Sequence, residues 1–147
     1  MKVKFKKLHE DAKLPAYATP GAAAFDLVAS ENIIVYGGQT QLVKTGLAVE
    51  IPPGFEMQIR PRSGMSLKTT LRIPNSPGTI DSDFRGEICV IMHNTALPEG
   101  DWTAFVISKG DRIAQGAICP VIQAEMEFVD ELSSTDRGAG GFGSSGK

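Results

Sequence analysis

The chain has few of the features that would place it outside the cell or in a membrane. Only 2 of its 147 residues are cysteine, and both lie inside apolar stretches. No apolar run approaches the ~20 residues that a membrane-spanning helix needs. Residues 1–10 are basic and alternating, without the apolar centre of a secretion signal, so we interpret them as a strand. We therefore expect reduced cysteines, a cytoplasmic location and no association with a membrane.

The chain also carries little net charge. The formal charge is −2 and the isoelectric point is near 5.7. Such a balance provides no general attraction for nucleic acid, so we expect no nucleic-acid partner. A polyanionic ligand would have to be held by local donors. The length and the 41% hydrophobic content suit one domain with a single core.

Glycine and proline are abundant, whereas helical periodicity is nearly missing. The chain contains 16 glycines and 9 prolines, and turn signals separate segments of strand length. Residues 55–60 place Phe55, Met57 and Ile59 on one face, which is a period-2 pattern. Only residues 63–69 predict a helical turn or two. These patterns predict an all-β, jelly-roll-like barrel or sandwich of many short strands.

The composition changes after Glu131, so we predict a core domain over residues 1–131 and a flexible glycine-rich arm over 132–147. The end of this arm, RGAGGFGSSGK, has too few apolar residues to become ordered unaided. Its glycines would let backbone N–H groups approach a phosphate, and its arginine and serines add donors. A flexible tail or an expression remnant is the alternative. The isolated aromatic residue between glycines favours a lid for a nucleotide.

Three further segments carry candidate anion-binding groups. AAAFDL contains Asp26, which taken alone is equally typical of a turn or a cap. RPRSGMSLK contains Arg62, Ser63 and Gly64, which would present a guanidinium, a hydroxyl and backbone amides to one anion. GDRIAQ adds two residues that are either ligand-binding or structural hydrogen-bonders, Arg112 and Gln115.

The segment NSPGTIDSDFRGEI is the densest in chemical groups. Asn75 can pair with a base edge through its amide, and Gly78 permits a tight bend. Asp81, Asp83 and Glu87 are three carboxylates, each a candidate general base or metal ligand. In an extended chain Asp81 and Asp83 share a face. An acidic solvated hairpin is the alternative, and we favour it for Glu87.

Taken together, the order and spacing of these five segments resemble the trimeric dUTPase family over nearly the whole chain. The resemblance implies a homotrimer of jelly-roll-like subunits, with the C-terminal arm of one chain closing a site built by others. It implies hydrolysis of dUTP to dUMP and pyrophosphate, which limits uracil incorporation into DNA and supplies dUMP for thymidylate synthesis. Two residues depart from the usual family pattern: Phe84 stands where tyrosine is more frequent, and Ser145 where threonine is common.

The resemblance also implies roles for single residues. Asp81 would orient and deprotonate the water that attacks the α-phosphate, and Asn75 would help to bind uracil. The ring of Phe84 would pack under the deoxyribose and crowd a 2′-hydroxyl, and Phe142 would cover the uracil. The full set of substrate-binding residues implied in this way is Arg62, Ser63, Gly64, Asn75, Gly78, Ile80, Phe84, Gln115, Arg137, Phe142, Gly143, Ser144 and Ser145.

The family resemblance further implies Mg²⁺ as cofactor. The triphosphate and waters would hold the ion, with Asp26 reaching it through water and no direct protein ligand.

Other functions fit the chain less well. A dCTP deaminase, which shares the fold, uses a glutamate in the strand after the densest segment, whereas residues 88–93 here contain no carboxylate. A non-catalytic nucleotide sensor would not need Asp81 and the complete arm. A generic β-sandwich interaction module would leave five aligned polar segments unexplained.

Overall fold

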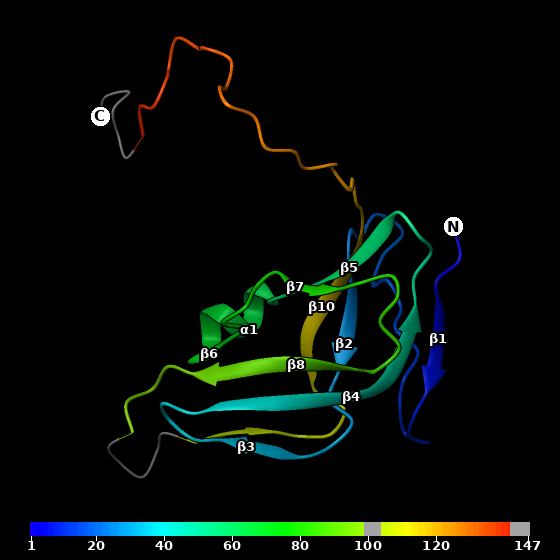
Figure 1. The fold of residues 1–147 in the computed structure, drawn as a ribbon. Helices are drawn as coiled ribbons and strands as arrows, with labels where there is room; N and C mark the ends of the chain where they lie inside the picture. The colour runs from blue at the N-terminus through cyan, green and yellow to red at the C-terminus, as the bar shows by residue number, and fades with distance from the viewer. Residues whose placement is uncertain (99–103, 142–147) are drawn as a thin grey trace.

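A computed structural model of the chain describes residues 1–98 and 104–141 (Figure 1). Four of the expected substrate-binding residues lie outside these ranges: Phe142, Gly143, Ser144 and Ser145.

The described residues form short strands and one helix, which confirms the predicted all-β class. The helix is α1 (Ser63–Lys68), in the one place where the sequence predicts helical turns. The strands are β1 (Lys4–Lys7), β2 (Phe25–Val28), β3 (Ile33–Val35), β4 (Thr40–Glu50), β5 (Phe55–Arg60), β6 (Leu71–Arg72), β7 (Gly78–Ile80), β8 (Glu87–Asn94), β9 (Phe105–Ile107) and β10 (Arg112–Pro120).

Two four-stranded sheets and a two-stranded ribbon, all antiparallel, make up the described part of the barrel. The strand orders are β1-β4-β8-β6 and β2-β10-β5-β7, and β3 pairs with β9 in the ribbon. Neighbouring strands are seldom consecutive in the chain, so the connections cross between the sheets, as in a jelly roll (Figure 1).

One core lies between the two sheets, and every second side chain along the strands points into it. Along β8, Ile88, Val90 and Met92 are buried, while the residues between them are only half-buried. Met57 and Ile59 on β5 enter the same core from the other sheet. The buried hydroxyl of Thr45 donates to the carbonyl of Ile88 at 2.7 Å, so this polar group is satisfied.

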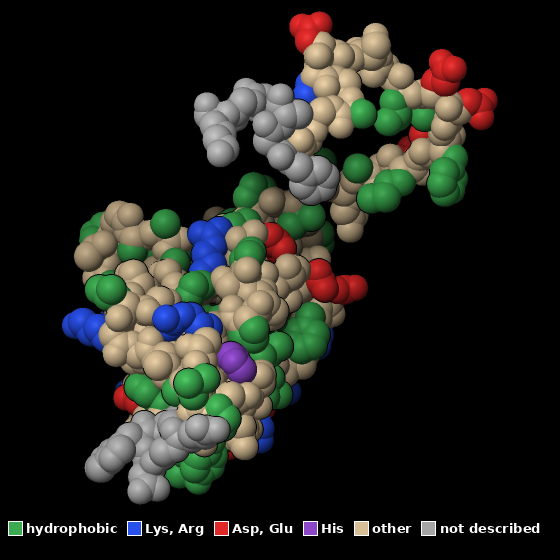
Figure 2. Space-filling model, turned by 90° about the vertical axis from the view of Figure 1, so that its left-hand side faces the viewer, with side chains coloured by type: hydrophobic (Ala, Val, Ile, Leu, Met, Phe, Trp, Pro, Cys, Tyr) green, Lys and Arg blue, Asp and Glu red, His purple; other side chains and the backbone are tan. Residues whose placement is uncertain are grey.

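The chain leaves the barrel where β10 ends. The amide of Val121 still donates to the carbonyl of Gly54 at 2.9 Å, but residues 122–139 are exposed and contain no helix or strand. This segment extends away from the barrel and carries acidic side chains (Figures 1 and 2). The predicted boundary at residue 131 falls inside it and stays a prediction. No helix in the described ranges is long and apolar enough to cross a membrane.

Gly116 makes room for a buried ring. It pairs with Phe25 across the sheet, and a methyl group on Gly116 would lie 2.4 Å from Cε2 and 2.8 Å from Cζ of that ring. The ring is buried and makes edge-to-face contacts with Phe5 and Tyr17, so it has no open space to enter.

We therefore expect Gly116→Ala to destabilise the fold by about 1–3 kcal/mol, because overpacking a filled core forces rings and backbone to shift. Thermal unfolding measures the loss. Gly21→Ala is the matched control, since no atom of the described chain lies within 4 Å of the added methyl group. Equal melting temperatures for the two variants would contradict this account.

Candidate functional site

Three of the predicted segments meet on the outer face of the β2-β10-β5-β7 sheet. Gln115 on β10 pairs with Asp26 on β2 and with Arg60 on β5, so these residues form one row across three strands. The opposite face of the same sheet carries Leu27 and Met57, which are fully buried. Alternation therefore directs the row away from the core.

A cluster of three charges lies at this row. Nε of Arg62 is 2.9 Å from Oδ1 of Asp26, and an NH1 nitrogen of Arg112 is 3.3 Å from Oδ2. Arg62 also donates to the backbone carbonyl of Arg112 at 3.2 Å. Two guanidinium groups share one carboxylate, so the cluster keeps one net positive charge, and Asp26 and Arg62 remain about one-quarter exposed. Such an arrangement can hold an anion.

Arg112 is the residue of this cluster that the expected set omits. Arg112 is three positions before Gln115, so regular alternation would put the two side chains on opposite faces of the sheet. A bulge between Arg112 and Ala114 shifts the register, so Ile113 turns into the core and Arg112 turns outward. The sequence signal for Arg112 was its place in GDRIAQ, but the bulge that gives it the same face as Gln115 is not readable from that pattern.

The start of α1 is held against the same row. The side-chain amide of Gln115 donates to the carbonyl of Pro61 at 2.8 Å. This bond holds the chain just before Arg62, the extended residue from which the helix begins. Ser63 and Gly64 are exposed at the first two positions of α1. The structure therefore brings Asp26, Arg62 and Gln115 together, and Ser63 and Gly64 follow Arg62 at the start of α1.

The segment from Asn75 to Ile80 forms the edge of the same sheet. Gly78 is buried and pairs with Ile59 on β5, and a methyl group on Gly78 would lie 3.2 Å from Nδ2 of Asn75. The Asn75 amide thus lies against the backbone of β7. Ile80 pairs with Met57 and packs against the core.

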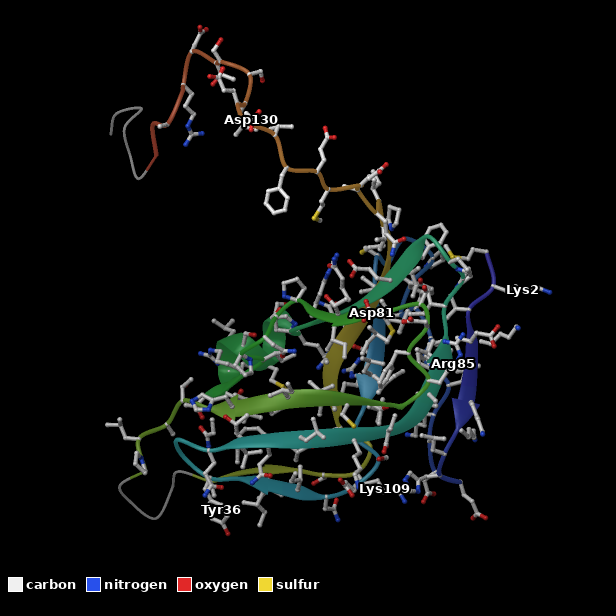
Figure 3. All side chains as sticks on the ribbon, in the orientation of Figure 1. Lys2, Tyr36, Asp81, Arg85, Lys109 and Asp130 are labelled. Atoms are coloured by element: carbon white, nitrogen blue, oxygen red, sulfur yellow. The ribbon has the colours of Figure 1, made fainter. Side chains whose placement is uncertain are left out.

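Asp81 lies beside an open hollow of about 460 Å³ that Glu56, Asp83 and Gln123 also line. Figure 3 shows Asp81 beside β5 and β7, on the side from which the C-terminal segment leaves. Asp81 and Asp83 both line this hollow, but so does Ser82 between them, because the chain turns here and is not the extended segment for which a shared face was predicted. The amide of Phe84 donates to the carbonyl of Asp81 at 3.2 Å, which closes the turn.

Within one chain, Asp81 and the charged cluster are apart. Asp81 follows Ile80, whose partner on β5 is Met57, whereas the row with Asp26 and Gln115 crosses β5 at Arg60. Four strand positions thus separate the two groups, or about 13 Å at ~3.3 Å per residue. Arg137 belongs to neither group, because its Nε donates to the carbonyl of Gly140 in the C-terminal segment at 2.8 Å.

Two carboxyl groups and one thiol have shifted pKa values. Hydrogen bonds from Lys109 and Lys4 lower the pKa of Asp11 and of Glu50 respectively. Burial raises the pKa of the Cys89 thiol, so this cysteine stays protonated at neutral pH. Residues 1–98 and 104–141 contain no group of three or more acidic, histidine or cysteine side chains that could hold a metal ion.

Comparison with known proteins assigns the family. The model of the dUTPase family matches residues 10–146. The chain belongs to the dUTPase family. The deoxyuridine 5′-triphosphate nucleotidohydrolase of Nautilia profundicola is 54% identical to it, with 100% of both chains covered. That of Wolinella succinogenes is 48% identical, covering 100% of this chain and 95% of its own. The predicted resemblance is thus confirmed.

Solved dUTPase structures have the same fold. The dUTPase of Staphylococcus bacteriophage 80alpha, solved as a point mutant with dUpNHpp, superposes with a TM-score of 0.91 at 29% identity, covering 99% of each chain. The dUTPase of phage phi11 of S. aureus, solved as a point mutant and described as coordinating a structural Mg(II) ion, has a TM-score of 0.84 at 25% identity. It covers 90% of this chain and 99% of that one.

Proposed function

We propose that this chain is a dUTP diphosphatase, which hydrolyses dUTP to dUMP and pyrophosphate by attack of water on the α-phosphate. The observation that carries the proposal is the pair of groups on one exposed sheet face, the Asp26–Arg62–Arg112 cluster and the hollow beside Asp81. Relatives of the same length are named deoxyuridine 5′-triphosphate nucleotidohydrolases. The phage 80alpha enzyme was solved with dUpNHpp, a dUTP analogue.

Asp81 is the general base in this proposal. Its position after β7 places the carboxylate at the mouth of an open hollow, where water has access. A base needs hydrogen-bond reach to the attacking water, and the Asp81 side chain is exposed. Asp83 lines the same hollow and is the candidate if Asp81 is not the base.

The charged cluster binds phosphate oxygens. Arg62 and Arg112 offer more N–H donors than one carboxylate can accept, so donors stay available to an anion. Ser63 and Gln115 lie beside them and complete the donor set. Phosphoryl transfer depends mainly on positioning and charge neutralisation, which this set supplies.

Asn75, Gly78 and Ile80 bind the uracil, and Phe84 packs under the sugar. β7 is the last strand of its sheet in the described chain, so one edge of its backbone is not paired with another strand and can approach a base edge. The ring of Phe84 is 40% exposed and therefore available for contact with a ligand.

The residues present fit a magnesium ion held through water. Each oxygen of Asp26 accepts one guanidinium bond, so the carboxylate keeps acceptor capacity for metal-bound water. In this proposal the direct ligands of the ion are oxygens of the triphosphate and of water, and Asp26 reaches it through water. When bound, Mg²⁺ neutralises charge on the phosphates. The phage phi11 relative is described as coordinating a structural Mg(II) ion, so a protein with this fold can bind Mg²⁺.

The active site is shared between subunits of a homotrimer in this proposal. Four strand positions separate Asp81 from the charged cluster in one chain, and apposing two chains would bring the cluster of one against Asp81 of the other. The hollow beside Asp81 includes none of the cluster residues in its lining, which supports a donor set supplied by another copy.

The exposed C-terminal segment supports the same assembly. The apolar side chains of Ile122, Met126 and Phe128 are almost fully exposed, and they alternate with polar residues at 123, 125 and 127. This is the period-2 pattern of a strand that lacks a partner in its own chain. A neighbouring subunit would cover it and direct Arg137, Phe142, Gly143, Ser144 and Ser145 over that neighbour's nucleotide.

We expect Asp81→Asn to bind dUTP nearly as well as the wild type and to lose about 10²–10⁴-fold in kcat, because the amide keeps the shape but cannot accept the proton. Pyrophosphate release with Mg²⁺ and each deoxynucleoside triphosphate in turn measures this. The wild type should cleave dUTP and none of the other deoxynucleoside triphosphates. An Asp81→Asn variant with turnover within a few-fold of wild type would transfer the role of base to Asp83.

We expect two inactive variants to restore activity when mixed. One carries Asp81→Asn, and the other ends before Arg137; a mixed trimer combines an intact Asp81 from one chain with an intact arm from another. The mixed chains are partly unfolded in a mild denaturant and then refolded so that subunits exchange, and dUTP hydrolysis is then measured. The wild type mixed with either variant is the control for exchange. A monomer in sedimentation, or no recovery after proven exchange, would contradict the shared site.

A further inference from the structure

The turn between β7 and β8 carries two groups assigned to the reaction, Asp81 and Phe84, followed by two residues with no assigned role, Arg85 and Gly86. Both of these contact the turn. Figure 3 shows Arg85 below Asp81, toward β1 and β4.

The ring of Phe84 lies on the backbone of Gly86. A methyl group on Gly86 would be 2.5 Å from Cζ of the ring, 3.0 Å from Cε2 and 3.3 Å from Cε1. Carbon atoms in contact are about 3.5–4.0 Å apart, so no side chain fits at position 86 while the ring stays in place. The ring is 40% exposed, which means that the core does not hold it in this position.

The backbone does not itself require glycine at position 86. The described glycines with positive φ are Gly38, Gly46, Gly54, Gly110 and Gly138, and Gly86 is not among them. Alanine is therefore compatible with the conformation of the chain at this point. The ring of Phe84 is the group that needs the space.

Arg85 holds the backbone of the same turn. Its NH1 nitrogen donates to the carbonyls of Ser82 and Phe84, each at 2.8 Å. Together with the bond from the Phe84 amide to the Asp81 carbonyl, these contacts close the turn. An added side chain at position 86 would accordingly displace the exposed ring rather than the backbone.

We propose that Gly86 is a positioning residue that sets the orientation of the Phe84 ring and, through it, the preference for 2′-deoxyribose over ribose in the substrate. This inference rests on the proposed function, in which that ring packs under the sugar. Gly86 acts here only by leaving space, and it touches no substrate atom. It differs from Gly116, whose neighbouring ring is buried and cannot leave.

The experiment is a double-mutant cycle on dUTP and UTP hydrolysis, with Gly86→Ala, Phe84→Ala and the double variant. Gly86→Ala should lower kcat/KM for dUTP on the order of tenfold, the effect of losing about 1.4 kcal/mol of binding. It should leave kcat/KM for UTP unchanged or higher, so the dUTP-to-UTP ratio falls. In the Phe84→Ala background, Gly86→Ala should change kcat/KM for neither dUTP nor UTP, because the ring that it displaces is already gone.

Two controls separate positioning from damage to the fold. Gly21→Ala introduces the same methyl group in open space and should leave the ratio at the wild-type value. The melting temperature of Gly86→Ala should equal that of wild type, since an exposed ring can move into solvent. If Gly86→Ala unfolds and Phe84→Ala does not rescue it, the backbone needs the glycine and the inference is overturned.

The remaining outcomes are also decisive. An unchanged ratio in Gly86→Ala, or additive effects in the double variant, would overturn the inference alone if the wild type hydrolyses dUTP. A wild-type protein that does not hydrolyse dUTP would overturn the proposed function and this inference with it.

Discussion

The rest of the site depends on the register of β10 between β2 and β5. This register aligns Gln115 with Asp26 on one side and with Arg60 on the other, and the bulge after Arg112 adds a second guanidinium to the same face. Asp26 then has two cationic partners, which leaves the cluster with a positive charge exposed to solvent. A shift of β10 by one residue would turn its own side chains, Gln115 and Arg112, toward the core and away from Asp26.

The same register separates the cluster from the carboxylate that we propose as the base. Asp81 lies four strand positions away along β5, on the same face but beside a different hollow. A single barrel is too rigid to bring the two together, because β5 is hydrogen-bonded on both edges and packed on its inner face. The homotrimer that we propose would bring the two groups together from different chains and would cover the exposed apolar side chains of the C-terminal segment.

Two glycines illustrate how differently one residue type is used in this fold. Gly116 accommodates the buried ring of Phe25 and is required by packing. Gly86 accommodates the ring of Phe84, which is 40% exposed and lies on the glycine backbone. In both places the backbone dihedral angle is permitted to other residues, so the neighbouring aromatic side chain explains the glycine.

The sequence by itself determined the fold class, the family and the identity of most candidate groups. Alternation along residues 55–60 and the weak helical signal at 63–69 are local patterns, and the structure has elements at these places. The tertiary structure decided which groups meet. The outward turn of Arg112 depends on a bulge against β2, the distance of Asp81 from Asp26 depends on pairing through β5, and the contact of Phe84 with Gly86 depends on the closed turn. These features arise from hydrogen bonding between strands far apart in the chain or from side-chain orientation in a turn, and a period-2 pattern contains no information on either.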